Sequence, residues 1–501
     1  MSRRAHVVAS TVTVGVVAFL LVAGVADAAR LTRGPYLQSV MQDSGLVVFQ
    51  TDTACAAQVR YGPGGVLTLT AASNSTVRQH SILLSGLQPA TEYSYVIEGC
   101  GVSSGEPRSF RTASGPQARE VRFAVLGDFG IEGSAQAAVA RSLQARRPEL
   151  VVTVGDNIYE SGTDAEFESN FLRPLASLLA EVPFFPSLGN HEYVTNQGQP
   201  YLDNLYLPAN NPRGTERYYS FDWGSVHFVA LDSSCLRGSA TADRCTADEQ
   251  LKWLEQDLAA SRAHWKVVCL HHPLWSSGKY GSFVPLRQRL APILEAGGVD
   301  LVFSGHEHDY ERSRPMKGDA EVQPGTAGGI TYVVVGSGGA SLRPFTKAKP
   351  AWSVVRDAEN NGFLEVSVQG MRLHAQLVTP SGKEVDSFAL SKPLPPDAAQ
   401  EPGDAGSADE GGPPAVTPPP ERPGAVIESP ASARQDEPSL DAGVKCSASG
   451  STVLLGPLSG LLLALIRRRP RHRGRLTRPA AASLAHTPPL AVSAPACISG
   501  V

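Results

Sequence analysis

The sequence predicts two folded domains in succession, an all-β sandwich and then an α/β domain built as four layers, with two sheets packed face to face between helices (αββα). Short segments that alternate apolar and polar residues, without helical periodicity, run from residue 34 to about residue 112. From residue 121 onward, apolar runs of strand length alternate with helix-like segments. The 501 residues are enough for more than one hydrophobic core.

Residues 1–28 have the pattern of a secretory signal peptide. Arg3 and Arg4 precede an apolar stretch at 7–25, and residues 26–28 supply the small side chains that favour cleavage. The apolar stretch also approaches the length of a membrane span, so an uncleaved anchor is the alternative. We expect export, with the mature protein secreted, periplasmic or at the cell surface.

The cysteines and the charge balance agree with an exported protein. Cys55 with Cys100, and Cys235 with Cys245, are two candidate disulfide pairs, whereas Cys269 lies in an apolar strand and is expected to be a buried thiol. Lys plus Arg total 44 against 48 for Asp plus Glu, a net charge of −4. Because a dedicated nucleic-acid binder usually shows a basic excess, we expect no nucleic-acid partner.

Residues 30–113 make up the predicted β domain. Its expected strands are 45–51, 56–61, 79–84, 92–98 and 108–111. The stretch 87–95, Leu-Gln-Pro-Ala-Thr-Glu-Tyr-Ser-Tyr, resembles the corner of fibronectin type III domains, where a tyrosine hydroxyl bonds back to the backbone. The domain offers no cluster of acids, bases or ligands. A structural role is therefore expected, with glycan or protein binding as the alternative.

Residues 119–391 make up the predicted α/β domain. Strand 121–126, helix 134–146 and strand 150–154 form one βαβ unit. A second helix is expected after Thr246, because Thr246 and Glu249 have capping-box spacing ahead of an apolar stripe. The further expected strands are 182–188, 226–231, 267–270, 301–303, 332–335, 363–368, 372–377 and 387–390.

The C-terminal part has a different character. Residues 392–445 are rich in Pro, Gly, Ala and acids and are predicted to be a disordered linker, because they cannot bury enough apolar surface. Residues 446–470 resemble bacterial C-terminal sorting signals, with Cys446, a short apolar stretch and an arginine cluster in that order. This resemblance predicts possible attachment to the cell envelope. Residues 471–501 have no assignment.

Five short motifs rich in Gly, Asp, Asn and His each follow or close one of the apolar strands of the α/β domain. In layered α/β folds, chemistry gathers outside the carboxyl ends of the strands. The side chains that the motifs bring toward one edge are Asp128, Asp156, Tyr159, Asn190, His191, His271, His306 and His308.

These residue types predict a metal site. Carboxylate and phenolate suit a hard, highly charged ion such as Fe(III), whereas histidine with asparagine suits a divalent ion such as Zn, Mn or Fe(II). Seven or eight ligands are too many for one ion. One carboxylate that bridges two ions about 3.5–4 Å apart uses all of them, which is the two-metal arrangement for phosphoryl chemistry.

The five motifs resemble those of the calcineurin-like metallophosphoesterases, and the tyrosine in Gly-Asp-Asn-Ile-Tyr is similar to the purple acid phosphatase branch. The resemblance implies a dinuclear centre of Fe(III) and a divalent ion (Zn, Fe or Mn). It assigns Asp128, Tyr159 and His308 to Fe(III), Asn190, His271 and His306 to the divalent ion, and Asp156 to the bridge. The phase of the His-x-Pro-x-Trp-Ser motif selects His271 over its neighbour His272, which then lies behind the ligands.

The resemblance further implies hydrolysis of small phosphate monoesters by attack of a metal-bound hydroxide, with His191 as proton donor or transition-state stabiliser. The sequence departs from the family where many relatives have another histidine. Here that position is Tyr280, preceded by Lys279, and its hydroxyl can hydrogen-bond a phosphate oxygen. His191, His272 and Tyr280 are therefore the candidate catalytic residues.

Two other functions remain open from the sequence. The same site can serve a phosphodiesterase or a nucleotide hydrolase, because an ion pair does not select which ester oxygen leaves. A more remote alternative is a catalytically inactive binding protein of the cell surface. The physiological substrate and the oligomeric state are not predicted.

Overall fold

In the computed structural model, the described residues are 29–392 except 100, 242 and 243. The predicted signal peptide, the sorting-type segment, the tail and all of the linker after residue 392 lie outside this range. Within the described range, none of the helices combines the length and the apolar character needed to cross a membrane.

The N-terminal region is β-rich and contains two antiparallel sheets. The first has the order β1 (Leu31–Gln38), β2 (Ser44–Cys55), β5 (Val77–Ser85). The second has the order β4 (Leu69–Ala72), β3 (Gln58–Pro63), β6 (Glu92–Gly99), β7 (Val102–Ser103), and β8 (Arg108–Arg111) also pairs with β6. The Tyr93 hydroxyl accepts a hydrogen bond from the backbone N–H of Gln88 at 3.0 Å, so a tyrosine does tie this strand back to the preceding turn.

The N-terminal strands also contact the α/β domain through hydrogen bonds from buried side chains. Tyr36 donates to the backbone oxygen of Asn204 at 2.9 Å, and Tyr95 donates to that of Ala180 at 2.7 Å. Buried hydroxyls with carbonyl partners fix the two surfaces against each other. The structural role of the N-terminal region stays a prediction.

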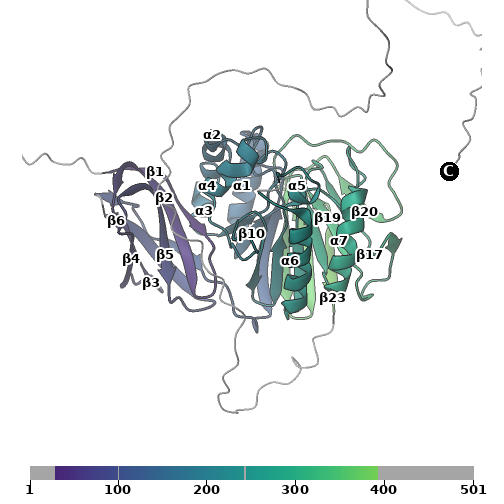
Figure 1. The fold of residues 1–501 in the computed structure, drawn as a ribbon, viewed down its shortest axis with the longest axis horizontal. Coiled ribbons are helices and arrows are strands. Elements are labelled where there is room, and N and C mark those ends of the chain that lie inside the picture. Colours follow the sequence, from purple (N-terminus) through teal and green to yellow (C-terminus); the bar gives the residue numbers. More distant parts are fainter. Residues whose placement is uncertain (1–28, 100, 242–243, 393–501) are drawn as a thin grey trace, which may run out of the picture. The chain divides into compact units, whose positions relative to one another are not determined.

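The α/β domain contains two large sheets (Figure 1). The six-stranded sheet has the order β11 (Phe184–Pro186), β10 (Leu150–Thr153), β9 (Glu120–Leu126), β21 (Phe363–Gln369), β22 (Arg372–Val378), β23 (Ser387–Ser391). The seven-stranded sheet has the order β12 (Tyr219–Trp223), β13 (Val226–Ala230), β14 (Trp265–Cys269), β15 (Leu301–Ser304), β19 (Thr331–Val335), β16 (Tyr310–Ser313), β20 (Ser353–Asp357). Strands β9 to β11 are parallel to one another, as are β13, β14, β15 and β19.

The two faces of β14 belong to two different cores, because successive side chains of a strand point to opposite sides. Val267 and Cys269 pack in the core shared with the six-stranded sheet. Val268, on the other face, packs under the helices α6 (Ala247–Ala260) and α7 (Val284–Ala296), which lie side by side in Figure 1. Helix α1 (Ser134–Arg146) links β9 to β10 and is buried through Val139 and Leu143. The predicted α/β layering is therefore observed.

The remaining helical segments are short and lie in the connections between strands. They are α2 (Asp164–Glu166), the π-helix η1 (Phe167–Leu172), α3 (Ala176–Leu179), the 3-10 helix η2 (Asn196–Gly198), α4 (Gln199–Asn204) and α5 (Ser233–Leu236). A short hairpin of β17 (Met316–Lys317) and β18 (Ala320–Glu321) follows β16.

The capping box predicted at the start of α6 is wrong. Thr246 is the N-cap residue, but its side chain makes no capping bond to the backbone. Instead its hydroxyl donates to the Glu249 carboxylate at 3.2 Å, and that carboxylate is also held by Arg213 at 3.0 Å. Because Glu249 pairs with two side chains, it is drawn away from the backbone N–H that a capping box requires. A complete box occurs at the start of α2, between Thr163 and Glu166.

The structure describes two of the three cysteine predictions. Cys235 and Cys245 form a disulfide that closes the loop after α5, and Cys269 is a buried free thiol, both as predicted. Cys100 lies outside the described residues, so its pairing with Cys55 stays a prediction.

Candidate metal centre

The predicted ligands stand in loops that directly follow parallel strands. Asp128 follows β9 and Asp156 follows the adjacent β10, whereas His271 follows β14 and His306 follows the adjacent β15. Asp128, Asp156 and His306 have φ values of 53°, 47° and 70°, in the left-handed region that residues with a side chain seldom adopt. Such backbone strain persists where the surrounding structure holds it, and it concentrates at functional sites.

One group of donor atoms consists of Asp128 Oδ1, the Tyr159 hydroxyl and His308 Nε2. The tyrosine hydroxyl is 3.1 Å from Asp128 Oδ1 and 3.2 Å from His308 Nε2, and the last two atoms are 3.5 Å apart. Ligands at about 2.1 Å from one ion and at right angles to each other are separated by about 3 Å. The three atoms therefore have the spacing of ligands to a single ion.

A second group consists of Asn190 Oδ1, His271 Nε2 and His306 Nδ1. The amide oxygen is 3.0 Å from His271 Nε2 and 2.9 Å from His306 Nδ1, and the two nitrogens are 3.3 Å apart. This group mixes two imidazole nitrogens with one neutral oxygen, a set that suits a divalent transition metal.

Asp156 lies close to both groups. Its Oδ2 is 3.3 Å from His271 Nε2 in the second group. One ligand atom each from Asp128, Asp156 and His271 fit within 4.8 Å of one another, so Asp156 also lies near the first group. The seven predicted ligands thus converge, with Asp156 close to both groups.

The backbone fixes which nitrogen two of the histidines present. His271 Nδ1 donates to the Val154 carbonyl at 2.9 Å, and His308 Nδ1 donates to the Ser341 carbonyl at 3.0 Å. Since a carbonyl only accepts, each Nδ1 carries a proton, and Nε2 is the nitrogen that each ring directs toward the other ligands.

The electrostatics of the site favour bound cations. Burial raises the pKa of Asp128 and that of Tyr159 well above their usual ranges, and burial lowers the pKa of His308 to about 4. Burial alone would also lower the pKa of His271, but the charges of Asp156 and Asp128 raise it to about 9. Burying acids together is costly unless positive charge compensates them. Carboxylate, phenol, amide and imidazole donors therefore fit a pair of metal ions in both chemistry and charge.

Glu192 holds two of the ligand loops together, a role that the sequence analysis did not find. Its carboxylate accepts backbone N–H bonds from Gly189 at 2.5 Å, Asn157 at 2.7 Å, and both Asp156 and Ile158 at 3.2 Å. Burial, together with the nearby charge of Asp156, raises its pKa to about 7. The sequence feature that could have indicated this role is the position of Glu192 in the Gly-Asn-His-Glu motif, two residues after Asn190.

His191 lies at the edge of the ligand cluster. Its Nδ1 donates to the backbone oxygen of Glu160 at 2.6 Å, and its Nε2 is 3.8 Å from Asp156 Oδ2. The ring packs edge-on against Tyr159 with 4.4 Å between centroids. With Nδ1 tethered, Nε2 is the nitrogen available to a substrate.

His272 is fully buried behind the ligands. Its Nδ1 is 2.8 Å from Ser233 Oγ, and its Nε2 accepts from Arg237 at 2.5 Å. Its ring packs on that of His306 with 4.7 Å between centroids. Burial, together with the charges of neighbouring His271 and His306, lowers its pKa well below the usual range. Because both ring nitrogens already have protein partners, neither is free to contact a substrate. The ring supports His306 by packing against it.

Tyr280 is 53% exposed and its ring centroid is 5.1 Å from that of His306. Two cations lie over the ring, Lys279 at 5.0 Å and Arg343 at 5.2 Å. Neither Arg343 nor Arg237 belongs to a recognisable motif, and sequence reasoning missed both. Only the folded chain brings them beside the ligand His306.

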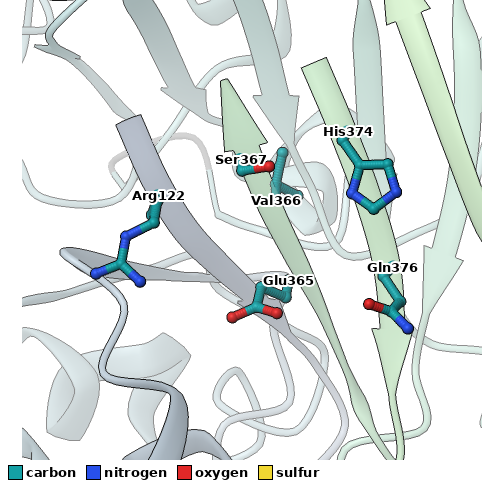
Figure 2. Close-up of a pocket in the computed structure, with 6 residues that line it drawn as sticks. All are labelled: Arg122, Glu365, Val366, Ser367, His374 and Gln376. Atoms are coloured by element: carbon teal, nitrogen blue, oxygen red, sulfur yellow. The ribbon is translucent and has the colours of Figure 1, made fainter. Parts of the chain in front are cut away.

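A separate hollow of about 240 Å³ lies on the six-stranded sheet (Figure 2). It is lined by Arg122, Glu365, Val366, Ser367, His374 and Gln376 from β9, β21 and β22. None of the seven ligands lines it, and its residues stand along the middle of strands and not in the loops after them. The chemistry therefore belongs to the ligand cluster.

This fold and this donor set are those expected of a metal-dependent phosphoesterase of the calcineurin-like type. Residues 121–310 match the family described as Calcineurin-like phosphoesterase, and residues 329–387 match the one described as Iron/zinc purple acid phosphatase-like protein C. The two matched segments together are therefore similar to hydrolytic phosphoesterases of the purple acid phosphatase type.

Named relatives agree with this placement. The chain is 28% identical to "Acid phosphatase type 7" of Mus musculus over 63% of this chain and 77% of the relative. It is 31% identical to "Purple acid phosphatase 23" of Arabidopsis thaliana over 52% of this chain, but it spans only 62% of that relative's length. The structure of purple acid phosphatase PPD1 from yellow lupin (Lupinus luteus) seeds superposes with a TM-score of 0.62 and 21% identity, over 76% of this chain and 77% of the other, which shows a shared fold.

Proposed function

We propose that this chain is an exported phosphatase that hydrolyses small phosphate monoesters at a dinuclear metal centre. The observation that carries the proposal is the pair of donor groups, each with atoms 2.9–3.5 Å apart, with Asp156 close to both. The family placement supports phosphoester hydrolysis in general, and the monoester substrate and the two-ion centre are the finer parts of the proposal.

The residues divide between the two ions by chemical type. Asp128, Tyr159 and His308 would hold Fe(III), because carboxylate and phenolate are hard donors. Asn190, His271 and His306 would hold a divalent ion, Zn, Fe or Mn, and Asp156 would be shared. When bound, such a pair of ions supplies an activated water and positive charge against the developing oxyanion.

The protein's own side chains supply binding and proton delivery. His191 presents Nε2 to the leaving-group oxygen, since its Nδ1 is held by the Glu160 carbonyl. General-acid help of this kind contributes typically ~10²–10⁴-fold. Tyr280 presents its hydroxyl from the exposed rim to a phosphate oxygen. Glu192 keeps the loops of Asp156 and Asn190 in register through its backbone hydrogen bonds.

Export and the type of the N-terminal domain also belong to the proposal. The Cys235–Cys245 disulfide supports an oxidising compartment, because disulfides are rare in reducing ones. The two antiparallel sheets and the Tyr93 corner support a fibronectin type III-like assignment. Attachment to the cell envelope through the C-terminal segment is proposed on the sequence pattern alone. Cell fractionation with antibody detection tests the location, and a cytoplasmic pool would contradict it.

Metal analysis combined with two substrates tests the enzyme proposal. Purified protein should contain two metal ions per chain, one of them iron, and should hydrolyse an aryl phosphate faster than an aryl phosphodiester. Asp156→Asn should lose both metal and turnover, whereas Asp248→Asn, at a side chain 98% exposed, makes the same chemical change at the surface and should lose neither. A visible phenolate-to-iron band should vanish in Tyr159→Phe.

Each contrary result would favour a different alternative to the proposed function. Faster turnover of the diester would favour a phosphodiesterase or nucleotide hydrolase. Metal-free protein without turnover would favour an inactive binding protein of the cell surface. Activity that survives exhaustive chelation would rule out the mechanism.

A further inference from the structure

Arg343 lies against the segment that carries two of the ligands. Its Nη1 donates to the backbone oxygen of His306 at 2.9 Å, and its backbone N–H donates to the oxygen of His308 at the same distance. The side chain is half-buried. The guanidinium is therefore tethered by one nitrogen beside the donor cluster, and its other N–H groups remain for another acceptor.

Arg343 has no acid partner within residues 29–392 as the structure describes them. Among the described residues, no carboxylate oxygen lies within ion-pair distance of its guanidinium. Glu307 and Asp309 are near enough for the arginine charge to counter the upward effect of burial on their pKa values, but neither pairs with it. A half-buried guanidinium that lacks a carboxylate is costly unless an anion reaches it. A guanidinium also has the planar fork that matches two oxygens of a phosphate.

The neighbours of Arg343 form the exposed rim of the site. The Tyr280 ring centroid is 5.1 Å from that of His306, and the cations Lys279 and Arg343 lie 5.0 and 5.2 Å from the same ring. Arg237, the other cation near His306, is already bound to His272 Nε2 at 2.5 Å and lies 4.1 Å over the Phe283 ring. Lys279 is an exposed point charge on a long aliphatic stem, whereas Arg343 is tethered to the His306 carbonyl, so Arg343 is the cation with a fixed position at the rim.

We propose that Arg343 is a catalytic residue that donates hydrogen bonds to the non-bridging oxygens of the phosphate group being hydrolysed, with its guanidinium 5.2 Å from the centre of the Tyr280 ring. This inference rests on the proposed function, because it assigns a further contact to the same substrate. On this proposal, phosphate is recognised by two N–H donors of the Arg343 guanidinium as well as by the loops that carry the ligands.

The experiment uses metal-loaded, full-length protein and inorganic phosphate as the probe. Arg343→Gln removes the charge and the fork, and Arg343→Lys keeps the charge alone. Lys349→Gln removes one positive charge from an exposed side chain of the same loop and is the matched control. For each protein, metal content, the phosphate dissociation constant by calorimetry, and kcat and KM for an aryl phosphate are measured.

Arg343→Gln should keep both metals and bind phosphate roughly 10- to 100-fold more weakly, the range for loss of a charge-assisted hydrogen bond. Its kcat/KM should fall by at least as much. Arg343→Lys should be intermediate, and Lys349→Gln should match the wild type.

Three results would overturn the inference while leaving the proposed function in place. They are unchanged phosphate affinity in Arg343→Gln, an equal loss in Lys349→Gln, and loss of metal from Arg343→Gln, which would mean that Arg343 acts only through the His306 carbonyl. If the metal-loaded wild type itself neither binds phosphate nor hydrolyses the ester, the proposed function fails, and this inference fails with it.

Discussion

His227 bridges two carboxylates, one on each ring nitrogen. Its Nδ1 is 2.7 Å from Asp222 Oδ1 on β12, and its Nε2 is 2.9 Å from Asp257 Oδ2 on α6. Burial alone would lower the pKa of His227, but the hydrogen bonds and charges of the two aspartates raise it to about 9. The protonated ring on β13 therefore joins its own strand to the neighbouring strand β12 and to helix α6.

The raised pKa is equivalent to a stabilising free energy. A pKa of about 9 in the folded chain, against about 6.5 when unfolded, corresponds to about 3 kcal/mol. Because Asp222 is 42% exposed, solvent weakens its share, and roughly 2 kcal/mol is the expected size. Since the folded pKa is raised, the stabilisation is complete below pH 6.5 and is lost as the pH rises through about 9.

Urea unfolding of wild type and His227→Gln at pH values from 6 to 9.5 tests this reasoning. Glutamine keeps a hydrogen-bonding side chain of similar size but does not titrate. The difference in free energy of unfolding between the two proteins should shrink by roughly 2 kcal/mol across this range. Taking the difference removes the contribution of other titrating groups, such as the ligand histidines. A difference that is independent of pH would refute the assignment of a charged His227.

Further expectations concern the site and its supports. Glu192→Gln should weaken metal binding, because an amide cannot accept all four backbone N–H bonds, and unchanged metal affinity in a chelator titration would contradict this role. His191→Gln should lower kcat by roughly 10²–10⁴-fold for esters with poor leaving groups and far less for aryl phosphates, so an equal loss for both would argue against a general acid. Cys235→Ser with Cys245→Ser should cost roughly 2–3 kcal/mol in thermal unfolding, and an unshifted midpoint would show that the loop is held by other contacts.

The strands that the sequence predicted are those with an apolar side. β10 and β15 are buried throughout, and β9 is buried without interruption from Phe123 to Leu126, because helices or sheets cover these segments on both faces. β1 was missed because Gly34 and Pro35 interrupt it, and β4 because its side chains are mostly exposed and show no alternation. The alternation of apolar and polar residues indicates which side chains are buried. A strand that is held mainly by backbone hydrogen bonds, with few buried side chains, therefore gives no such pattern in the sequence.

Some residues of the ligand cluster could likewise be predicted from local sequence patterns, and others could not. The ligands were predictable because each belongs to a polar motif at a strand end, where the sequence changes abruptly. Arg343 and Arg237 stand in loops with no such change, and their approach to His306 depends on the path of the chain after β19 and on the disulfide loop after α5. His272 shows the converse: it belongs to a motif, but Ser233 and Arg237 occupy its two ring nitrogens, so neither nitrogen is free to contact a substrate.

Glycines in the motifs leave the space that the ligand loops need in order to pack against one another. A Cβ on Gly189 would collide with the side chain of Asp156, and a Cβ on Gly305 would collide with the carboxylate of Asp128. Each glycine thus makes room for a ligand that comes from a different motif and a different strand. The motifs therefore specify contacts between loops as well as donor atoms. An alanine at Gly189 or Gly305 should displace a carboxylate that lies far away in the sequence, so metal loss in these variants would follow from packing alone, without any change of ligand.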